Sequence, residues 1–561
     1  MSKEQRIKRT KTSRRSDLAA PSLLGKMLIL IPIIGALFVW LSPLSFVPVP
    51  WPDDSAFYFV ARDFFKWPPR WVMIPQSPFE PTYRIFNFNT MPLYPMIIGL
   101  GRFIGIDGSF AIKFWPLLGW ALSGSLCVAA ALKRGLPRIA ALILALLFAL
   151  DPALRWASVL VRPESMIGLC GVAIVLGITL GFPKRFEVRG RFWDPIAALL
   201  AIGALLHFNA VYLVFPVIAA FVLTNPRRLL QIGLKTGLYL TPWLLTVALH
   251  PQLFVHQMKT QWTRLSGGND WLHSFDKAVG GLFQSMGSPE PWHPIVYQAS
   301  ILVWLLLLIA MGLGINDFIN TIKKKHRHDS LAPAAAWILS SCWLWNSKPE
   351  VWFTYYIHIS LLCFLTLALL RAFNNSKSPT VSTAALKGTL SLLGLGLVLC
   401  FSVIDSDQLS KMSRSPSWRW ETYGDFVDCV DKRLTELETT LQTTTAPAPK
   451  PFRVWCPTFP DITIELSRRH PDWELTRTND FWERVPLALQ HGRDVEAVVV
   501  TESINPAERL ISSPASEHPE IQSVWMTWKG YFLHNLYDEP GWKPNRYYCQ
   551  RGKWQAFIFM K

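Results

Sequence analysis

The stretch WPDDSAFYFVARDFF, residues 51–65, places two adjacent carboxylates, Asp53 and Asp54, directly after a long segment without charge. That uncharged segment, residues 27–52, has the length and composition of a first membrane span. Carboxylates beside a bilayer lose solvation free energy and attract cations, so a protein that places a pair there generally uses it. The pair therefore marks a candidate site at a membrane surface.

The same stretch is also typical of the start of a helix. In PDDS the carboxylates would meet the first free N–H groups and the positive end of the helix dipole. The residues that follow favour a helix with Asp54, Tyr58 and Arg62 on one face. Capping accounts well for one acid and less well for two, so a cap and a site both stay open as interpretations.

The composition is that of a membrane protein with some soluble mass. Only 17% of the 561 residues are charged, which is below the roughly 25% usual for soluble domains. The net charge of +17 comes from basic residues in short loops between apolar runs, which indicates membrane topology and contact with anionic lipid rather than nucleic acid. The first segment is too long for the apolar region of a cleaved signal peptide, and no cleavage site stands out.

Eleven apolar runs predict transmembrane helices, and the basic loops set their orientation. With the N-terminus in the cytoplasm, eleven spans put every basic loop on the cytoplasmic side as well. The uncharged stretch 195–226 must then hold two helices that turn near His207 and Asn209, because a single helix would place Arg227 and Arg228 outside. The basic loops are residues 133–138, 183–191, 225–228, 323–328 and 371–377. The apolar runs are residues 27–48, 112–132, 138–150, 165–182, 195–206, 210–224, 235–250, 295–315, 331–346, 351–370 and 386–404.

The predicted fold class is an α-helical polytopic membrane protein with a small extracytoplasmic α/β domain at the C-terminal end. The predicted parts are a basic cytoplasmic arm (1–26), a membrane module (27–404) with outer loops at 49–111 and 251–294, a linker (405–451) and the α/β domain (452–561). In the last part FRVWC, WELTR, EAVVVT and SVWMTW predict short strands, which alternate with the helical stretches DITIELSRRH and DFWERVPLAL.

Three of the eight cysteines, Cys429, Cys456 and Cys549, follow the last apolar run. A disulfide between two of them is expected if this part faces an oxidising compartment, and the sequence does not choose the pair. No pair has the spacing of metal ligands. The other five cysteines lie in apolar runs and are expected to be small core residues.

Under this topology, polar residues embedded in apolar surroundings converge on the outer face, which predicts a cleft at the outer leaflet. Each also has a structural interpretation. Asp151, before a proline, fits a helix terminus; Arg162 and Glu164 fit a mutual pair. His207 fits a satisfied core histidine, and Lys348 fits a lysine that snorkels to the surface. The complete set is Asp53, Asp54, Asp151, Arg155, Arg162, Glu164, His207, Asn209, Lys348 and Glu350.

These motifs, in their order, resemble those of the membrane-embedded C-type glycosyltransferases (GT-C). The segment PDDSAFYFVARDF is similar to the first outer loop of the branch that uses lipid-phosphosugar donors, which includes protein mannosyltransferases and aminoarabinose transferases. Further segments that resemble this branch are NTMPLYPMIIGLGRFIG, VRPESMIGL, LLHFNAVYLVFPVI and NSKPEVWFTYY. The resemblance covers roughly residues 27–404. Aminoarabinose transferases tend to carry lysines at the position of Asn89 or Thr90 and near His207, so the resemblance does not carry over their donor sugar.

The resemblance implies an inverting glycosyltransferase of the plasma (inner) membrane. It would move a hexosyl or pentosyl group from a polyprenyl-phosphate donor to a lipid, glycan or protein acceptor at the outer face. Asp53 matches the first acid of the family's pair and is expected to deprotonate the acceptor hydroxyl, with Asp54 in support. The long loop 251–294, with Gly267 and Gly268 as a hinge, is expected to close over bound lipid. The candidates for the donor and phosphate site are Arg84, Arg162, Glu164, His207, Arg264 and Lys348.

A metal and two other functions stay open. Asp53, Asp54 and Glu164 would form an oxygen-rich site of the kind that Mg²⁺ or Mn²⁺ prefers. A donor with a single phosphate leaves less charge to neutralise, so no metal or other cofactor is expected. The first alternative is a flippase or transporter of lipid-linked saccharide, which would carry mid-span charges and an internal repeat. The second is an oligosaccharyltransferase with a lipid-diphosphate donor, which would need a metal site.

Overall fold

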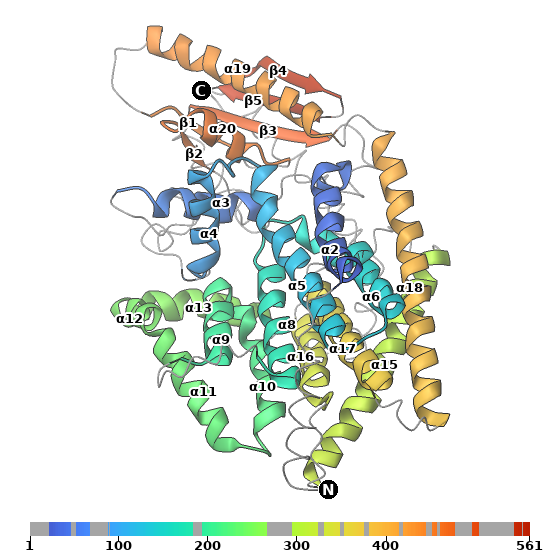
Figure 1. The fold of residues 1–561 in the computed structure, drawn as a ribbon. Helices are drawn as coiled ribbons and strands as arrows, with labels where there is room; N and C mark the ends of the chain where they lie inside the picture. The colour runs from blue at the N-terminus through green and yellow to red at the C-terminus, as the bar shows by residue number, and fades with distance from the viewer. Residues whose placement is uncertain are drawn as a thin grey trace, which may run out of the picture.

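The structure is a computed structural model, and every structural statement below concerns the residues that it describes. These are residues 22–46, 52–67, 88, 90–182, 193–265, 294–323, 330–347, 353–374, 381–414, 419–444, 451–456, 460–476, 496–503, 543–552 and 554–560. Figure 1 shows a bundle of helices, two short helices above it, and a small sheet domain above these.

Each of the eleven apolar runs contains at least one helix of the bundle. The helices are α2 (Leu23–Leu41), α5 (Phe114–Lys133), α6 (Arg138–Leu150), α7 (Pro152–Ser158), α8 (Glu164–Leu180), α9 (Pro195–Leu206), α10 (Val214–Phe221), α11 (Pro226–Tyr239), α12 (Thr241–Leu249), α15 (Pro294–Ile322), α16 (Ala332–Ser347), α17 (Thr354–Asn374) and α18 (Val381–Ser413). Helix α9 ends at Leu206 and a 3₁₀-helix, η6 (Phe208–Leu213), follows, so the chain breaks where a turn was expected.

By length and composition alone, fewer of the described helices qualify as single membrane spans than the eleven predicted. Five described helices are long and apolar enough to cross a membrane, and up to seven spans result if each of two bent helix pairs counts as one. One bent pair, α11 with α12, turns by 59° inside the predicted run 235–250. Three further apolar helices are shorter. The helices themselves are as expected, and the count of eleven spans stays a prediction.

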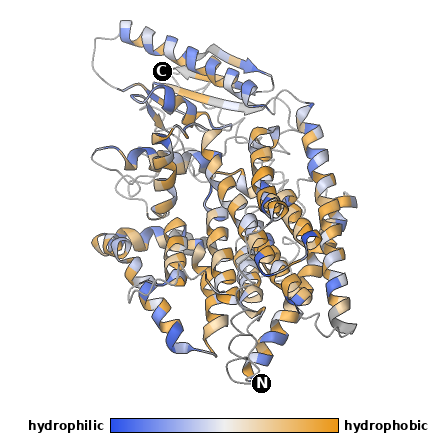
Figure 2. Ribbon diagram, in the orientation of Figure 1, coloured by the Kyte–Doolittle hydropathy of each residue, from blue (hydrophilic) through white to orange (hydrophobic). Residues whose placement is uncertain are grey.

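Helix packing explains which faces of the bundle meet lipid. Helix α17 is buried on nearly all sides and forms the centre of the bundle. Large apolar side chains on outer helices point away from it, such as Ile34 (60% exposed), Leu308 (64%) and Leu399 (61%). In Figure 2 the ribbons of the bundle helices are coloured mostly as hydrophobic. Apolar faces of this extent require a nonaqueous surrounding, which the bilayer supplies.

Small residues allow close helix contact in the bundle. At Gly119 of α5, an added Cβ would lie 2.9 Å from the backbone nitrogen of Met166 in α8. At Gly171 of α8, a Cβ would lie 2.3 Å from the indole ring of Trp337 in α16. Because lipid tails are as apolar as leucine, helices in a membrane associate through such close packing. Helix α8, which begins at Glu164, is thus fixed on two sides.

The stretch that carries the acidic pair is helical, as predicted. It forms α3 (Pro52–Phe64), which packs against α4 (Leu93–Phe103) between the bundle and the sheet domain. The contact is close at Gly99, where a Cβ would lie 2.9 Å from the carbonyl oxygen of Ala61. Helix α13 (Pro251–Leu265) follows α12 and occupies the first part of the predicted outer loop 251–294.

The C-terminal α/β domain is present, with a five-stranded sheet in the order β2-β1-β3-β5-β4. Strand β1 pairs in parallel with β2 and β3, whereas β5 runs antiparallel to β3 and β4. The elements are α19 (Trp420–Thr444), β1 (Arg453–Trp455), α20 (Thr463–Arg469), β2 (Glu474–Thr476), β3 (Ala497–Ser503), β4 (Lys543–Arg551) and β5 (Trp554–Met560).

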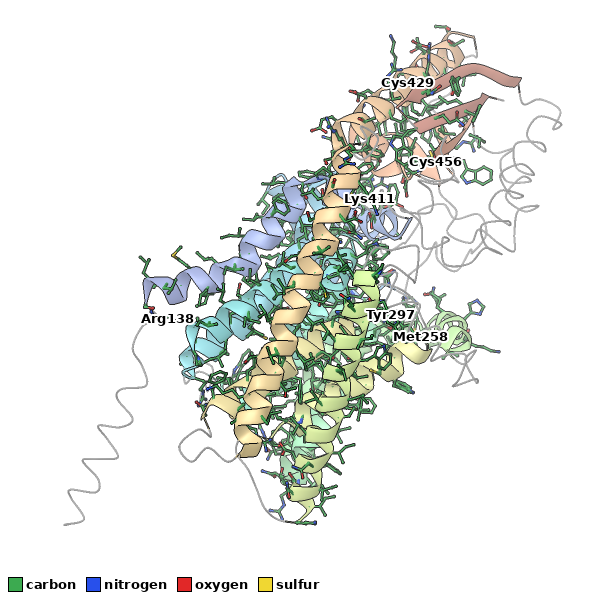
Figure 3. The ribbon with its side chains drawn as sticks, turned by 90° about the vertical axis from the view of Figure 1, so that its right-hand side faces the viewer. Arg138, Met258, Tyr297, Lys411, Cys429 and Cys456 are labelled. Atoms are coloured by element: carbon green, nitrogen blue, oxygen red, sulfur yellow. A yellow bond between two sulfur atoms is a disulfide. The ribbon has the colours of Figure 1, made fainter. Side chains whose placement is uncertain are left out.

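The predictions for this domain were incomplete. Strands β1, β2 and β3 and helix α20 lie in segments predicted for them, whereas β4 and β5 were not predicted. The segments SVWMTW and DFWERVPLAL lie outside the described residues. Most of the predicted linker, residues 405–451, is helical, because it contains the end of α18 and all of α19. Figure 3 shows α18 running from the bundle towards the sheet domain, with Lys411 near its outer end.

Three polar contacts dock the sheet domain onto one end of the bundle. Arg62 of α3 donates to the Ser467 hydroxyl at 2.7 Å. The backbone N–H of Ser109 donates to Glu465 at 2.7 Å, and the indole of Trp420 donates to the Ser45 hydroxyl at 2.9 Å. The domain therefore rests on the helix that carries the acidic pair.

A disulfide joins Cys429 of α19 to Cys549 of β4, whose Cα atoms are 5.9 Å apart. The sequence had left this pairing open. The bond closes a loop with a sequence separation of 120 residues, and it ties α19 onto the sheet. Cys456, the third candidate, is buried and is not in a disulfide.

Removal of this disulfide is expected to destabilise the sheet domain. Replacing both Cys429 and Cys549 by serine should lower its free energy of unfolding by roughly 2–5 kcal/mol, because a long loop of the unfolded chain is no longer closed. Protease digestion of the domain over a temperature series measures the change. Cys456→Ala is the control for loss of a buried thiol. Equal midpoints for wild type and the double variant would contradict the prediction.

Candidate functional site

Asp54 lies in the first turn of α3 and is 1% exposed. Its Oδ1 accepts the backbone N–H of Val161 at 3.0 Å, in the loop that joins α7 to α8. A capping carboxylate would bind N–H groups of its own helix. The bond from Val161 connects α3 to a loop of the bundle, so helix capping alone does not account for Asp54.

Arg162 and Glu164 follow directly after that loop and form a buried ion pair. The Nε and Nη2 atoms of Arg162 lie 3.0 and 2.9 Å from Oε1 of Glu164. Glu164 is the first residue of α8, where the helix dipole stabilises a negative charge. Both nitrogens bind one oxygen, and Oε2 of Glu164 is buried without a hydrogen-bond partner among the described residues. The predicted mutual pair is confirmed, with one carboxylate oxygen left over.

Two buried tyrosines bring further hydroxyls to this ion pair. Tyr94 of α4 is fully buried, and burial raises its pKa well above the ordinary value. The charges of Glu164 and Asp54 raise that pKa further, whereas Arg162 lowers it. The hydroxyl of Tyr356 in α17 also interacts electrostatically with Glu164 and Arg162. Neither hydroxyl has a hydrogen-bond partner among the residues that the structure describes.

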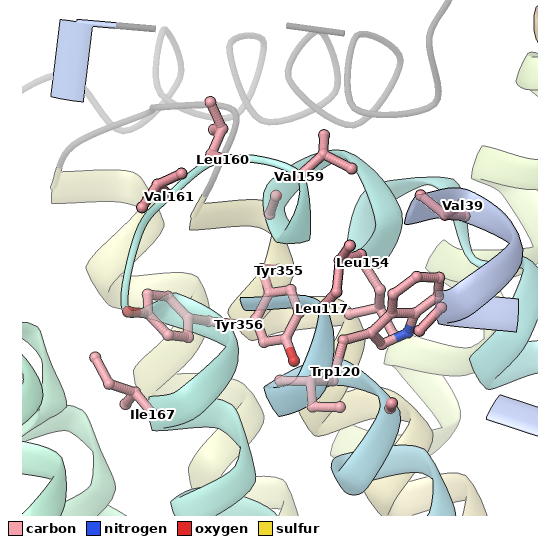
Figure 4. Close-up of a cluster of buried hydrophobic side chains, with 14 of the residues drawn as sticks. Val39, Leu117, Trp120, Leu154, Val159, Leu160, Val161, Ile167, Tyr355 and Tyr356 are labelled. Atoms are coloured by element: carbon pink, nitrogen blue, oxygen red, sulfur yellow. The ribbon is translucent and has the colours of Figure 1, made fainter. Parts of the chain in front are cut away.

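Aromatic packing fixes Tyr356 under the α7–α8 loop. Its ring lies 4.6 Å from that of Tyr212 in η6 and 6.0 Å from that of Phe353, measured between centroids. In Figure 4, Tyr355 and Tyr356 lie beneath the loop that carries Val159, Leu160 and Val161. The loop that binds Asp54 is thus supported from below by rigid side chains, and it can hold the carboxylate in one place.

Asp151 and Arg155, which were expected in the cleft, bind other helices instead. Asp151 caps α7 by accepting the N–H groups of Ala153 and Leu154 at 2.9 and 3.0 Å. Its other oxygen lies 2.8 Å from Nδ1 of His358 in α17. Arg155 pairs with Asp405 and Gln408 of α18. The helix-terminus interpretation of Asp151 is confirmed, and these contacts anchor α7, the helix before the site loop.

His207 ends α9 and has a local role. Its Nδ1 accepts the backbone N–H of Asn209 at 3.1 Å, and its ring packs on Phe208 at 4.2 Å. Both His207 and Asn209 are buried, at 8% and 6% exposed. This contact agrees with the interpretation of His207 as a core histidine whose hydrogen bond is satisfied. A role of His207 in binding the donor stays a proposal.

Five predicted site residues cannot be placed by their side chains. Arg84 and Lys348 lie outside the described residues, as does Glu350. Asp53 lies in α3 and Arg264 in α13, but only their backbone is described. Gly267 and Gly268, the expected hinge, also lie outside this set. The part of the candidate site that the structure assembles thus consists of Asp54, Arg162 and Glu164.

Helix α13 is held at the outer side of the bundle. The side-chain oxygen of Gln257 accepts the backbone N–H of Phe88 at 2.7 Å. The ring of Phe88 lies 5.4 Å from that of Phe254 in α13 and 5.6 Å from that of Trp243 in α12. The elbow between α12 and α13 therefore packs on the segment that leads to α4, near Thr90.

Sequence reasoning missed Tyr94 and Tyr356 as site residues. Both lie in motifs that had been singled out, PLYP and WFTYY, but only the segments were used and not the tyrosines. A buried tyrosine normally has a partner for its hydroxyl. The signal available in the sequence was therefore a tyrosine in the predicted outer loop, Tyr94, whose hydroxyl would need a partner if it were buried.

Metal ligands are not brought together in the described part of the chain. No group of three or more His, Cys, Asp or Glu side chains that could hold an ion occurs there. The side chain of Asp53 is not among those described, so the expectation of a metal-free site remains a prediction.

Solved structures with the same fold exist. ArnT from Cupriavidus metallidurans bound to undecaprenyl phosphate matches 94% of this chain and 97% of its own, with a TM-score of 0.52 and 13% identity. Its apo state matches with the same coverage, a TM-score of 0.51 and 12% identity. No protein-family model and no curated protein matches the chain. The GT-C-like membrane module with a small C-terminal sheet domain is therefore confirmed as the fold.

Proposed function

We propose that this protein is an inverting glycosyltransferase that uses a polyprenyl-phosphate sugar donor. The acceptor would be a lipid, a glycan or a protein. The observation that carries the proposal is the buried contact between the acidic helix α3 and the α7–α8 loop, next to the Arg162–Glu164 pair. A protein of the same fold, ArnT from Cupriavidus metallidurans, has been solved with undecaprenyl phosphate bound.

The proposed reaction is a single displacement at the anomeric carbon of the donor. The acceptor oxygen forms a bond to that carbon while its bond to the phosphate oxygen breaks, and polyprenyl phosphate leaves. Asp53 takes the proton of the acceptor hydroxyl. Asp54, held by Val161, positions the start of α3. One displacement inverts the configuration at the anomeric carbon.

Cationic groups would bind the phosphate as its charge develops. Arg162, which lies next to Glu164, is 8% exposed. Its guanidinium can donate two hydrogen bonds to phosphate oxygens. The remaining oxygen of Glu164 and the hydroxyl of Tyr94 are buried hydrogen-bonding groups that fit sugar hydroxyls. Arg84, His207, Arg264 and Lys348 complete the proposed donor contacts.

The proposed location is the plasma (inner) membrane, with the N-terminus in the cytoplasm and the sheet domain outside. The disulfide between Cys429 and Cys549 supports this orientation, because such bonds form and persist in oxidising compartments. The basic loops would then lie in the cytoplasm. The acidic helix, which contacts the sheet domain through Arg62 and Ser467, would lie at the outer leaflet.

Transfer of labelled sugar tests the proposed function. Purified protein in lipid vesicles is incubated with a panel of radiolabelled polyprenyl-phosphate sugars and membrane extract. Label is expected to move from at least one donor into an acceptor. Translocation of the donor without transfer would replace the enzyme by a flippase. Transfer only from a lipid-diphosphate saccharide, with a divalent metal, would indicate an oligosaccharyltransferase.

Tyr94→Phe is expected to lower transfer without destabilising the protein. The hydroxyl is buried and has no partner among the described residues, so its removal should leave the thermal midpoint unchanged. A lost hydrogen bond to the sugar should reduce kcat/KM roughly three- to tenfold. Tyr58→Phe is the matched control, because the charges near Tyr58 are Arg102, Asp107 and Arg62 rather than Glu164. Equal activity of both variants would remove Tyr94 from the site.

A further inference from the structure

A fully buried lysine lies at the outer start of α5 and is not used by the proposed reaction. Lys113 ends the 3₁₀-helix η4 (Ala111–Lys113) and is 0% exposed. Its Nζ donates to the backbone carbonyl oxygen of Ser45 at 2.9 Å. An ammonium group away from water costs much free energy unless negative charge or aromatic faces compensate it. The surroundings of Lys113 must therefore supply that compensation.

Asp54 supplies negative charge to Lys113. The carboxylate of Asp54 is an electrostatic neighbour of the Lys113 ammonium, and both side chains are buried, at 1% and 0% exposed. Water screens the attraction between two charges less when both groups are buried. The hydrogen bond of Lys113 to Ser45 goes to a neutral carbonyl, so this bond does not neutralise the charge of the ammonium.

Trp420, the first residue of α19, covers Lys113 from the side of the sheet domain. The Lys113 Nζ lies 5.4 Å from the centre of the Trp420 ring, within the range of a cation–π interaction. The ring is itself fixed, since its centroid lies 5.0 Å from that of Phe46 and 5.5 Å from that of Phe110. Its indole N–H binds Ser45, whose backbone oxygen accepts from Lys113.

These contacts connect the sheet domain to the acidic helix through one cation. On the basis of the proposed function, we propose that Lys113 is a positioning residue that holds Asp54 and the start of α3 in the reactive arrangement. Trp420 would place the ammonium, so the contact between Trp420 and Lys113 would set the efficiency of transfer. Under this proposal the sheet domain helps to position α3 and is not part of the donor site.

Substitution of Lys113 separates positioning from binding. Lys113→Met keeps the length of the side chain and removes its charge. A small displacement of reacting groups lowers turnover by up to about a hundredfold, so kcat per folded protein should fall to that extent. KM for the donor should stay within about twofold, because no phosphate contact is lost. An unchanged kcat, or a rise in KM that accounts for the loss, would overturn the proposal.

Three variants test the connection to the sheet domain. Trp420→Leu removes the aromatic face and should reproduce part of the kcat loss, whereas Trp420→Phe keeps a face and should lose less. Ser467→Ala breaks the Arg62 contact of the same docking surface without touching Lys113, and should leave kcat within about twofold of wild type. If Trp420→Leu and Ser467→Ala lowered kcat equally, docking of the sheet domain alone would explain the loss, and the role of the Trp420–Lys113 contact would be overturned.

Amide hydrogen exchange decides the proposal independently of sugar transfer. Exchange in α3 should be faster in Lys113→Met than in wild type, and unchanged in Ser467→Ala at the start of the helix, residues 52–55. If the wild-type protein transfers no sugar, the proposed function fails while the exchange data still test Lys113. If the wild type is active and exchange in α3 is unchanged by Lys113→Met, the positioning role is excluded.

Discussion

Replacement of Asp53 by asparagine is expected to lower kcat for sugar transfer by roughly 10²–10⁴-fold, the usual contribution of a general base. Asparagine keeps the size of the side chain but cannot accept the proton of the acceptor hydroxyl. The donor is bound by other groups, so its KM should change little. Single-turnover transfer with saturating donor measures the effect, and the folded fraction is checked by size exclusion in detergent.

Variants of Asp54 are the matched controls for this experiment. The Oδ1 of Asp54 accepts the N–H of Val161, and an asparagine oxygen can accept the same hydrogen bond. Asp54→Asn should therefore be less impaired than Asp54→Ala, and both should be less impaired than Asp53→Asn. A fully active Asp53→Asn would remove it as the base. An inactive Asp54→Asn with an active Asp53→Asn would exchange the two roles.

Most helices of the bundle could be predicted from the sequence because each is a continuous apolar run, whereas α7 and most of α11 lie outside the predicted runs. Their number of spans could not, because hydropathy does not show where a helix bends. The run 235–250 is interrupted at Leu240, where α11 and α12 meet at 59°. Helix α19 was missed for another reason: it is amphipathic and packs on the sheet, so its sequence lacks a long apolar run.

The candidate site was predictable where charged side chains carry the signal. Arg162 and Glu164 are two residues apart, so their pairing is local. The bond from Val161 to Asp54 joins residues 107 positions apart and uses a backbone donor, which every residue type except proline supplies. Lys113 was overlooked because a lysine at the end of an apolar run is typically at the surface. Its burial depends on Trp420, far away in the sequence.

The Arg162–Glu164 pair is expected to give the largest change in stability of any site substitution. Glu164→Gln leaves the Arg162 guanidinium buried next to a neutral partner, and Arg162→Met leaves a buried carboxylate. Removing one partner of a buried pair costs about 3–5 kcal/mol of unfolding free energy. Both single variants should therefore lose several degrees in thermal midpoint, measured by intrinsic tryptophan fluorescence in detergent.

The double variant Arg162→Met with Glu164→Gln separates this structural cost from the proposed role in phosphate binding. With both charges of the pair removed, neither residue is left without the other as a charged partner, so the thermal midpoint should return close to that of wild type. The donor phosphate would still lack its guanidinium, and KM for the donor should rise by about tenfold or more, since a hydrogen bond to a charged group contributes roughly 1.5–3 kcal/mol. Recovery of both stability and donor KM in the double variant would show that the pair only holds the start of α8. Recovery of stability alone places the Arg162–Glu164 pair at the donor, because a purely structural pair has no other way to affect donor binding once the fold is restored.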